Sequence, residues 1–265
     1  MSKLSIFLQI IKETIFNPRV AIELAAERTE IKDDEQYKKF QYSYDFISIK
    51  EFFSEKFPSE DISKFETELI ELEDYSNEFL DKLDSKNYPS KEKPYPINYS
   101  ISSDSRKFLY ILCRIMKPKN VIETGVAYGL SSFYILSALK KNDVGKLYSI
   151  DSVFRPWQSV EMIGNAVPEN LRNRWKLVLG KSNERLEEVF NDTDYVDIFI
   201  HDSLHSYKNM IFEFNCAINR IHENGIIISD DVIDNDAFHD FTNKNNLKNS
   251  IVKIEDSAIG YIEKN

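Results

Sequence analysis

The chain has 265 residues, of which 42% are hydrophobic, so it can bury the core of one large domain or of one domain with an extension. Its 34 basic and 44 acidic residues give a formal net charge of -10, and such a chain repels a phosphate backbone, so we expect no nucleic-acid partner. Only Cys113 and Cys216 are present, in amphipathic segments, which argues against a disulfide framework. No apolar run approaches the roughly 18–20 residues that cross a bilayer. We therefore expect no transmembrane segment and a cytoplasmic location.

Glycine usage divides the sequence into two parts. None of the 7 glycines precedes Gly125, so we expect a mainly helical region over residues 1–100 and a turn-rich domain over residues 101–265. In the first region, Ser59 is predicted to cap a helix from Glu60 to about Leu83. The proline-containing segment 85–100 is expected to be a linker or a loop over the domain that follows. We expect the first region to act as a lid or to form the interface of a homo-oligomer.

Helical and strand patterns alternate from about residue 105 onward. Strands are predicted at residues 120–124, 146–150, 176–179, 196–200 and 225–229, with helical segments between them, among them one over 207–222. The last residues, from about 251, read as two short strands joined by a turn. Five βα units followed by this hairpin predict an α/β fold: a Rossmann-like, doubly wound, mostly parallel sheet with a C-terminal antiparallel hairpin.

The first predicted strand leads into a turn that contains two glycines. Gly125 permits a tight strand-to-helix turn, and Gly129 lets the helix pack closely on the sheet. A dinucleotide fingerprint needs a further glycine between them, where this chain has Ala127, so a pyrophosphate would be crowded. The second strand ends at Asp151, in the position to accept hydrogen bonds from a ribose. These features predict a nucleoside ligand without phosphates, for which S-adenosylmethionine is the leading candidate.

Acidic residues follow the fourth and fifth predicted strands. Asp202 ends one strand, and Asp230 and Asp231 end the next. If the two strands are neighbours in a parallel sheet, about 4.8 Å apart, their carboxylates converge at the edge where such sheets bind ligands. Oxygen ligands of this kind suit Mg²⁺, which keeps positions open for two neighbouring substrate hydroxyls. The alternative is that the two aspartates only cap the segment that follows them.

His205 lies three residues after Asp202. Its ordinary pKa is about 6.5, so it can accept a proton from a metal-bound hydroxyl near neutral pH, although it could also make only a local hydrogen bond. His201 alternates with Asp202 along the strand and should face the other way, so we expect it to be structural.

Four motifs carry a resemblance to a known family: VIETGVAYGLSS, LYSID, the pattern D-x-x-H-x-Y in Asp202, His205 and Tyr207, and GIIISDD. With them, residues from about 103 to 260 resemble the class I S-adenosylmethionine-dependent methyltransferases. They look most like the small-molecule O-methyltransferases grouped with cephalosporin-hydroxylase-like and macrolide-sugar methyltransferases.

The resemblance implies positions for the cofactor and the metal. The methionine end would lie among Glu123, Gly125 and Ser131, the ribose at Asp151, and the adenine near Gly180 and Ser182. The full set of cofactor-binding residues that we predict is Glu123, Thr124, Gly125, Tyr128, Gly129, Ser131, Asp151, Gly180, Ser182 and Asp202. Metal-dependent relatives use an aspartate, an acidic pair and a histidine in roles that fall here on Asp202, Asp230, Asp231 and His205.

The sequence thus predicts methyl transfer from S-adenosyl-L-methionine to a hydroxyl of a small molecule or a sugar. Mg²⁺ or another divalent cation would assist, and His205 would be the general base. Two other functions stay open: a nucleotide-dependent oxidoreductase on the same fold, and a non-catalytic nucleoside-binding protein whose helical region recruits a partner.

Overall fold

A computed structural model describes residues 11, 15, 18–34, 44–153 and 157–264. Part of the predicted helical region therefore lies outside the described residues. In the described part of the chain, no helix is both long enough and apolar enough to cross a membrane.

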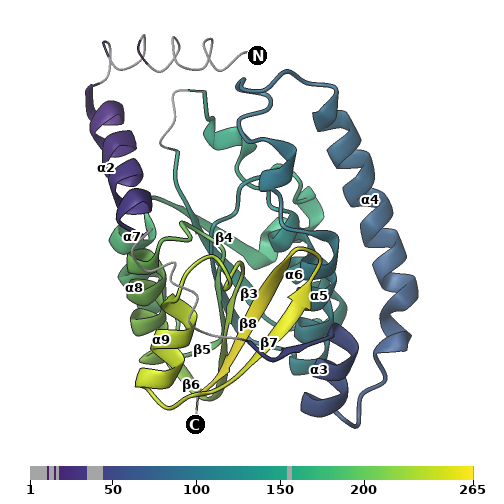
Figure 1. The fold of residues 1–265 in the computed structure, drawn as a ribbon. Helices are drawn as coiled ribbons and strands as arrows, with labels where there is room; N and C mark the ends of the chain where they lie inside the picture. Colours follow the sequence, from purple (N-terminus) through teal and green to yellow (C-terminus); the bar gives the residue numbers. More distant parts are fainter. Residues whose placement is uncertain (1–10, 12–14, 16–17, 35–43, 154–156, 265) are drawn as a thin grey trace.

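The centre of the molecule is an eight-stranded sheet in the order β1-β7-β8-β6-β5-β2-β3-β4 (Figure 1). Its strands are β1 (Phe46–Ile47), β2 (Asn120–Thr124), β3 (Lys146–Asp151), β4 (Trp175–Leu179), β5 (Val196–His201), β6 (Ile221–Ser229), β7 (Lys248–Ile254) and β8 (Ser257–Glu263). All neighbouring strands are parallel except for β8, which runs antiparallel to both β6 and β7. The predicted doubly wound sheet and its C-terminal antiparallel hairpin are confirmed.

Helices cover both faces of the sheet (Figure 1). The α-helices are α2 (Pro18–Asp34), α3 (Ile49–Lys56), α4 (Glu66–Asp84), α5 (Ser103–Met116), α6 (Leu130–Asn142), α7 (Ser182–Asn191), α8 (Tyr207–Ile218) and α9 (Ala237–Lys244). Short 3-10 helices are η2 (Ile62–Phe65), η3 (Ile97–Tyr99), η4 (Val160–Met162) and η5 (Glu169–Arg174). Helices α7, α8 and α9 lie on one face, α3, α5 and α6 on the other, and α4 lies outside α5 and α6.

Two predicted helix boundaries are wrong. Ser59 does not cap the helix of the first region: Asp61 accepts a hydrogen bond from Ser63 N at 3.0 Å and caps η2, and α4 begins at Glu66. The helix predicted over 207–222 ends at Ile218, and β6 already begins at Ile221. The reason is that Ile221 pairs with Val196 across a bulge in the sheet, a tertiary contact that helical periodicity does not reveal.

The first region shares its core with the sheet. Phe52 of α3 packs against Phe108 of α5 and Tyr261 of β8, with ring centroids 5.0 and 4.9 Å apart. All three residues belong to the larger apolar cluster of the molecule. Large aromatic side chains bury 150–250 Å² each, so this contact attaches α3 firmly to the sheet.

The segment 85–100, which we call the strap, lies against the glycine turn. The Tyr128 hydroxyl donates to Tyr95 O at 2.7 Å and accepts from Tyr95 N at 3.1 Å. Trp157 Nε1 donates to Pro94 O at 3.2 Å. The strap is therefore fastened both to the turn after β2 and to the loop after β3.

Candidate functional site

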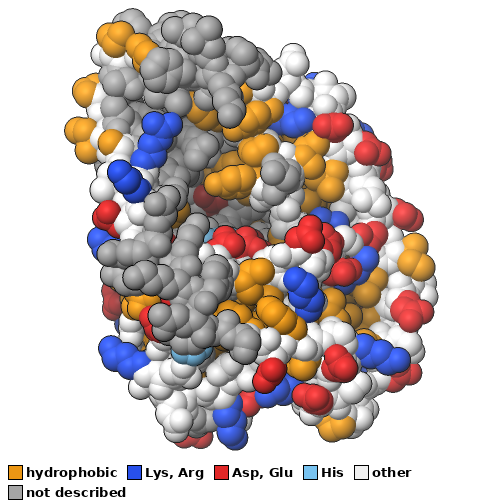
Figure 2. Space-filling model, in the orientation of Figure 1, with side chains coloured by type: hydrophobic (Ala, Val, Ile, Leu, Met, Phe, Trp, Pro, Cys, Tyr) orange, Lys and Arg blue, Asp and Glu red, His pale blue; other side chains and the backbone are white. Residues whose placement is uncertain are grey.

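The carboxyl ends of β2, β3, β5 and β6 lie at one edge of the sheet. Strand β5 pairs with β2 on one side and β6 on the other, and His201 is in register with Ser229. Asp202 and Asp230 follow these two residues directly, so the two acidic segments leave the sheet side by side. In Figure 1 the parallel strands point toward α2 and the strap. Figure 2, in the same orientation, shows acidic side chains at a hollow near the middle of the view.

The glycine turn is held in shape by Asp151. Its Oδ2 accepts hydrogen bonds from Val126 N at 3.0 Å and Ala127 N at 2.7 Å, and its Oδ1 accepts one from Ser152 N at 2.6 Å. Burial outweighs these bonds and raises the pKa of Asp151 to about 6. A ribose diol would therefore meet a carboxylate that already fixes the backbone of the turn.

Gly125 allows the turn to approach the loop after β5. Its φ is +85°, and an added Cβ would lie 1.8 Å from the carbonyl oxygen of Asp202. Gly129 also has a positive φ, +84°, and a Cβ there would lie 2.6 Å from Gly164 Cα. The positive φ of Gly125 fits the predicted tight turn, whereas the close neighbour of Gly129 is the loop at Gly164 and not the sheet.

Glu123 lies in the interior, beneath the glycine turn. Its carboxylate accepts hydrogen bonds from the hydroxyls of Ser131 at 2.5 Å, Ser132 at 2.6 Å and Ser149 at 2.7 Å. Burial outweighs these bonds and raises the pKa of Glu123 to about 7. Glu123 and Ser131 thus support the helix that follows the turn, and their contact with a cofactor stays a prediction.

The remaining predicted cofactor residues lie around the same edge. Thr124 is buried, and its hydroxyl donates to Glu213 Oε2 at 2.6 Å. Gly180 N donates to Asp151 O at 2.8 Å, which ties the end of β4 to that of β3. Ser182 opens α7, and its hydroxyl lies 3.4 Å from Asn209 Oδ1. Tyr128 is buried and holds the strap.

His205 lies between two of the predicted acidic residues. Its Nδ1 is 3.2 Å from Asp231 Oδ2, and its Nε2 is 3.6 Å from Asp202 Oδ1. Burial alone would lower the pKa of His205, but Asp202 and Asp231 outweigh it and raise this pKa well above its usual value. Asp231 in turn accepts a hydrogen bond from Ser257 Oγ at 2.5 Å.

The pKa of Asp202 and Asp230 is raised, whereas the hydrogen bond of His205 lowers the pKa of Asp231. Burial and the nearby charges of Asp202 and Asp231 raise the pKa of Asp230 well above its usual value. Burial also raises the pKa of Asp202, against the opposing effect of His205. Among the described residues, no Lys or Arg forms an ion pair with Asp202, Asp230 or Asp231. The positive partner of Asp202 and Asp231 in this cluster is therefore His205, whose raised pKa favours its protonated form.

Asp234 was missed by the sequence reasoning. One ligand atom each from His205, Asp231 and Asp234 lie within 4.8 Å of one another, the one such group of three among the described residues. Asp234 N donates to Asp231 O at 3.1 Å, so a turn brings the two carboxylates together. The spacing Asp231-x-x-Asp234 after a strand was the available signal. The predicted triad of Asp202, Asp230 and Asp231 stays a prediction.

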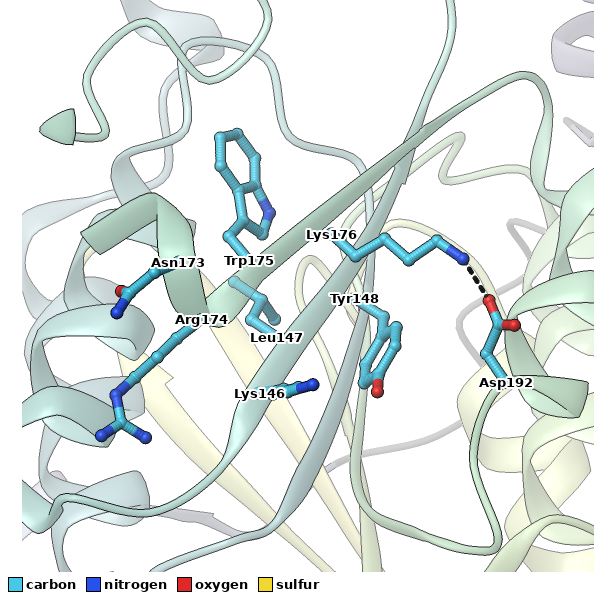
Figure 3. A pocket seen from close by; sticks show the side chains of 8 residues that line it. All are labelled: Lys146, Leu147, Tyr148, Asn173, Arg174, Trp175, Lys176 and Asp192. Atoms are coloured by element: carbon cyan, nitrogen blue, oxygen red, sulfur yellow. Dashed lines mark hydrogen bonds and ion pairs between the residues drawn. The ribbon is translucent and has the colours of Figure 1, made fainter. Parts of the chain in front are cut away.

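A separate cavity of about 250 Å³ opens at the opposite edge of the sheet (Figure 3). Lys146 and Trp175, the first residues of β3 and β4, line it, and Lys176 extends across it to Asp192 at 2.5 Å. Since it lies at the amino ends of the strands, it is not part of the acidic site.

Solved methyltransferases share this fold. The O-methyltransferase of Bacillus cereus, solved with SAH, aligns with a TM-score of 0.55 and 16% identity over 81% of this chain and 96% of its own. The SAH-bound methyltransferase of Podospora anserina aligns with a TM-score of 0.55 and 14% identity over 72% and 88%. The SAM-bound O-methyltransferase of Streptomyces achromogenes involved in tomaymycin synthesis aligns with a TM-score of 0.54 and 16% identity over 80% of this chain and 94% of its own. The fold is therefore that of a class I methyltransferase.

The sequence itself matches a family model over part of its length. Residues 122–232, from the first motif to the end of the acidic segment, match the family model of a methyltransferase domain. Residues 122–232 thus form a methyltransferase domain, and the predicted recognition and enzyme class are confirmed at this level. None of the curated proteins matches the chain in sequence.

Proposed function

We propose that the protein transfers a methyl group from S-adenosylmethionine to a hydroxyl of a small molecule, assisted by a divalent cation. The observation that carries this proposal is the group of carboxylates at the ends of β5 and β6, which has no Lys or Arg partner among the described residues and adjoins the glycine turn. Burial and, after it, repulsion between the carboxylates raise the pKa of Asp230 and Asp202, and a divalent cation relieves that repulsion.

The residues present fit both groups. Asp151 and the backbone of the glycine turn would hold the ribose, and Gly125 lets this turn pack directly against the Asp202 backbone, beside which the methionine end would lie. Asp202, Asp230 and Asp231, with Asp234 as a further oxygen donor, suit a hard ion such as Mg²⁺. When bound, the cofactor supplies an electrophilic methyl on its sulfonium sulfur, and the cation lowers the pKa of a coordinated hydroxyl.

His205 is proposed to take the proton. In the transfer, the hydroxyl proton would go to the imidazole of His205 as the acceptor oxygen takes the methyl group, and the cofactor would be left as a neutral thioether. The carboxylates beside His205 raise its pKa, so without a cation the imidazole already holds a proton at neutral pH. A cation that neutralises Asp202 and Asp231 removes that cause and frees His205 to act as a base.

The proposed acceptor carries two neighbouring hydroxyls, as sugars and catechol-like diols do, because an ion that keeps open positions can bind both oxygens. A cytoplasmic location and the absence of a nucleic-acid partner are proposed on the composition, and a homo-oligomer on the amphipathic pattern of the first region.

The test is transfer of a labelled methyl group from S-adenosylmethionine to a panel of diols and sugars, with Mg²⁺ and with EDTA. Labelled product that disappears on chelation supports the proposal, and undiminished transfer after thorough chelation removes the metal from it. Calorimetry with NAD and S-adenosylhomocysteine separates the oxidoreductase alternative. Ala127, at φ +47° in the turn, presents a side chain where that alternative needs a glycine.

A further inference from the structure

A buried carboxylate lies beneath the acidic site and was not predicted from the sequence. Glu213 of α8 is 0% exposed. It accepts hydrogen bonds from Thr124 Oγ1 at 2.6 Å and Ser203 Oγ at 2.7 Å, contacts His201 Nδ1 at 2.7 Å, and accepts a longer bond from Asn209 Nδ2 at 3.1 Å. One side chain thus joins the end of β2, the end of β5, the loop after β5 and α8.

The charge of Glu213 determines which ring nitrogen of His201 carries a proton. Burial would raise the pKa of Glu213, but the charge of His201 and the surrounding donors outweigh it and lower this pKa to about 2. An ionised carboxylate only accepts hydrogen bonds, so the proton between the two groups belongs to His201 Nδ1.

The other nitrogen of His201 faces a different situation. His201 Nε2 is buried and has no hydrogen-bond partner among the residues that the structure describes. The ring packs against His205, with centroids 5.3 Å apart and planes tilted by 56°. A buried nitrogen without a partner costs free energy, so its place beside the proposed base calls for a functional explanation.

The same network fastens the loop that carries Asp202 and His205. Asn209 Nδ2, held by Glu213, donates to Leu204 O at 2.9 Å. Asp202 N donates to Thr124 O at 2.9 Å, and Thr124 is itself bonded to Glu213. Both ends of the loop are therefore anchored through one buried carboxylate.

We propose that Glu213 and His201 are positioning residues that hold the Asp202–His205 loop in its metal-binding geometry. The proposal rests on the proposed function, because it takes the metal site as given, but its first test needs no metal. Partners of metal ligands in an outer layer commonly change metal affinity by about 10- to 100-fold when removed.

The first test is long-range ¹H–¹⁵N NMR of the imidazoles in the full chain. The chain has only 4 histidines, and His201→Phe and His205→Ala identify the two signals by loss. We expect His201 to carry a proton on Nδ1 in the wild type, and Glu213→Gln to shift the signals of both His201 and His205. A His201 protonated on Nε2 alone would overturn the proposal, as would a His205 signal whose chemical shift is the same in Glu213→Gln and in the wild type.

The second test is Mn²⁺ affinity, followed by EPR, beside S-adenosylhomocysteine affinity by calorimetry. Glu213→Gln should weaken Mn²⁺ binding about 10- to 100-fold and leave S-adenosylhomocysteine binding within about 3-fold. Glu187→Gln, which removes an exposed pair with Arg220, is the matched control and should change neither affinity. Equal Mn²⁺ affinity in wild type and Glu213→Gln overturns the proposal.

Ser203→Ala covers the case in which Glu213→Gln does not fold. It removes one hydrogen bond to Glu213, and the expected loss of Mn²⁺ affinity is about 3- to 10-fold. If the wild type itself binds no Mn²⁺, the proposed metal site fails, and the His205 signal alone then decides whether Glu213 positions the loop.

Discussion

Two groups of acidic residues in this molecule have opposite surroundings. On α4, Glu68 contacts Arg114 at 3.1 Å, and Glu73 contacts Arg106 at 3.1 Å. Burial alone would raise the pKa of both glutamates. The arginines and the neighbouring hydroxyls that donate to them outweigh burial and lower it. At the sheet edge, the pKa of Asp230 is raised, and no described Lys or Arg pairs with it.

This difference distinguishes acidic residues that stabilise the fold from acidic residues that are available to a ligand. Glu68 and Glu73 attach α4 to α5 and α6. Their negative charges are already paired with arginines, so they do not require a bound cation. The sheet edge keeps carboxylates close together at a cost in stability, a pattern found where a site awaits a ligand. Four predictions test this difference between the two groups.

The largest effect is expected from His205→Ala. Loss of the proposed base should lower the turnover rate by about 100- to 10,000-fold, because positioned proton transfer contributes a factor of that size. Binding of S-adenosylhomocysteine, measured by calorimetry, should stay nearly unchanged. His222→Ala, which removes a partly exposed histidine paired with Asp197, is the control. An unchanged rate in His205→Ala would remove the base assignment.

The next effect is expected from Asp230→Asn. Removal of one proposed ligand charge should lower Mg²⁺-dependent turnover by about 100-fold, at the upper end of the effect seen for groups that only support ligands. Steady-state rates over a range of Mg²⁺ concentrations measure this, and excess Mg²⁺ should restore part of the activity. Asp192→Asn at the distant cavity should behave like the wild type. A variant with full activity at every Mg²⁺ concentration contradicts the site.

Glu73→Gln tests the other half of the comparison. Because its bond to a charged arginine is lost, we expect a loss of about 1.5–3 kcal/mol in the free energy of unfolding, measured by urea denaturation, with turnover nearly unchanged. Glu78→Gln on the same helix, where the pair with Lys82 is exposed, should change stability little. Glu73→Gln with wild-type stability would show that the α4 pairs do not hold the helix.

The smallest effect is a pH dependence of stability. An acid whose pKa is raised by folding destabilises the folded state progressively as pH rises above its unfolded value, near 3.9 for Asp. In metal-free protein, Asp230→Asn should therefore be more stable than the wild type at pH 8, with a melting temperature about 2–4 °C higher for each 1 kcal/mol gained, and the difference should shrink toward pH 4. A gain that does not depend on pH would show that repulsion is not its cause.

The sequence was sufficient for the strands and for the edge at which the acidic residues meet. Strand β2 has its predicted bounds, since apolar runs between turns are a local signal, and Asp202 and Asp230 follow neighbouring strands as expected. The predicted cap was wrong because Ser59 and Asp61 are both good capping residues, and it is Asp61 that caps η2, the short helix before α4.

What the sequence did not reveal are contacts between distant residues. Glu213 belongs to an ordinary amphipathic helical pattern, which does not mark it out in the sequence. Its partner Thr124 is 89 residues away along the chain. Glu73 and Arg106 on α4 and α5 are likewise far apart in the chain, so their pairing depends on how the helices pack. Asp234 was overlooked because a turn, and not a strand end, brings it to His205.

The most direct test is a calorimetric titration of the protein with Mg²⁺ in the presence of S-adenosylhomocysteine. Our account predicts that one ion binds per chain, and that Asp231→Asn loses this binding while it keeps its affinity for S-adenosylhomocysteine. Absence of Mg²⁺ binding in the wild type, or equal binding in Asp231→Asn, would contradict the view that the carboxylates of this edge are arranged for a cation.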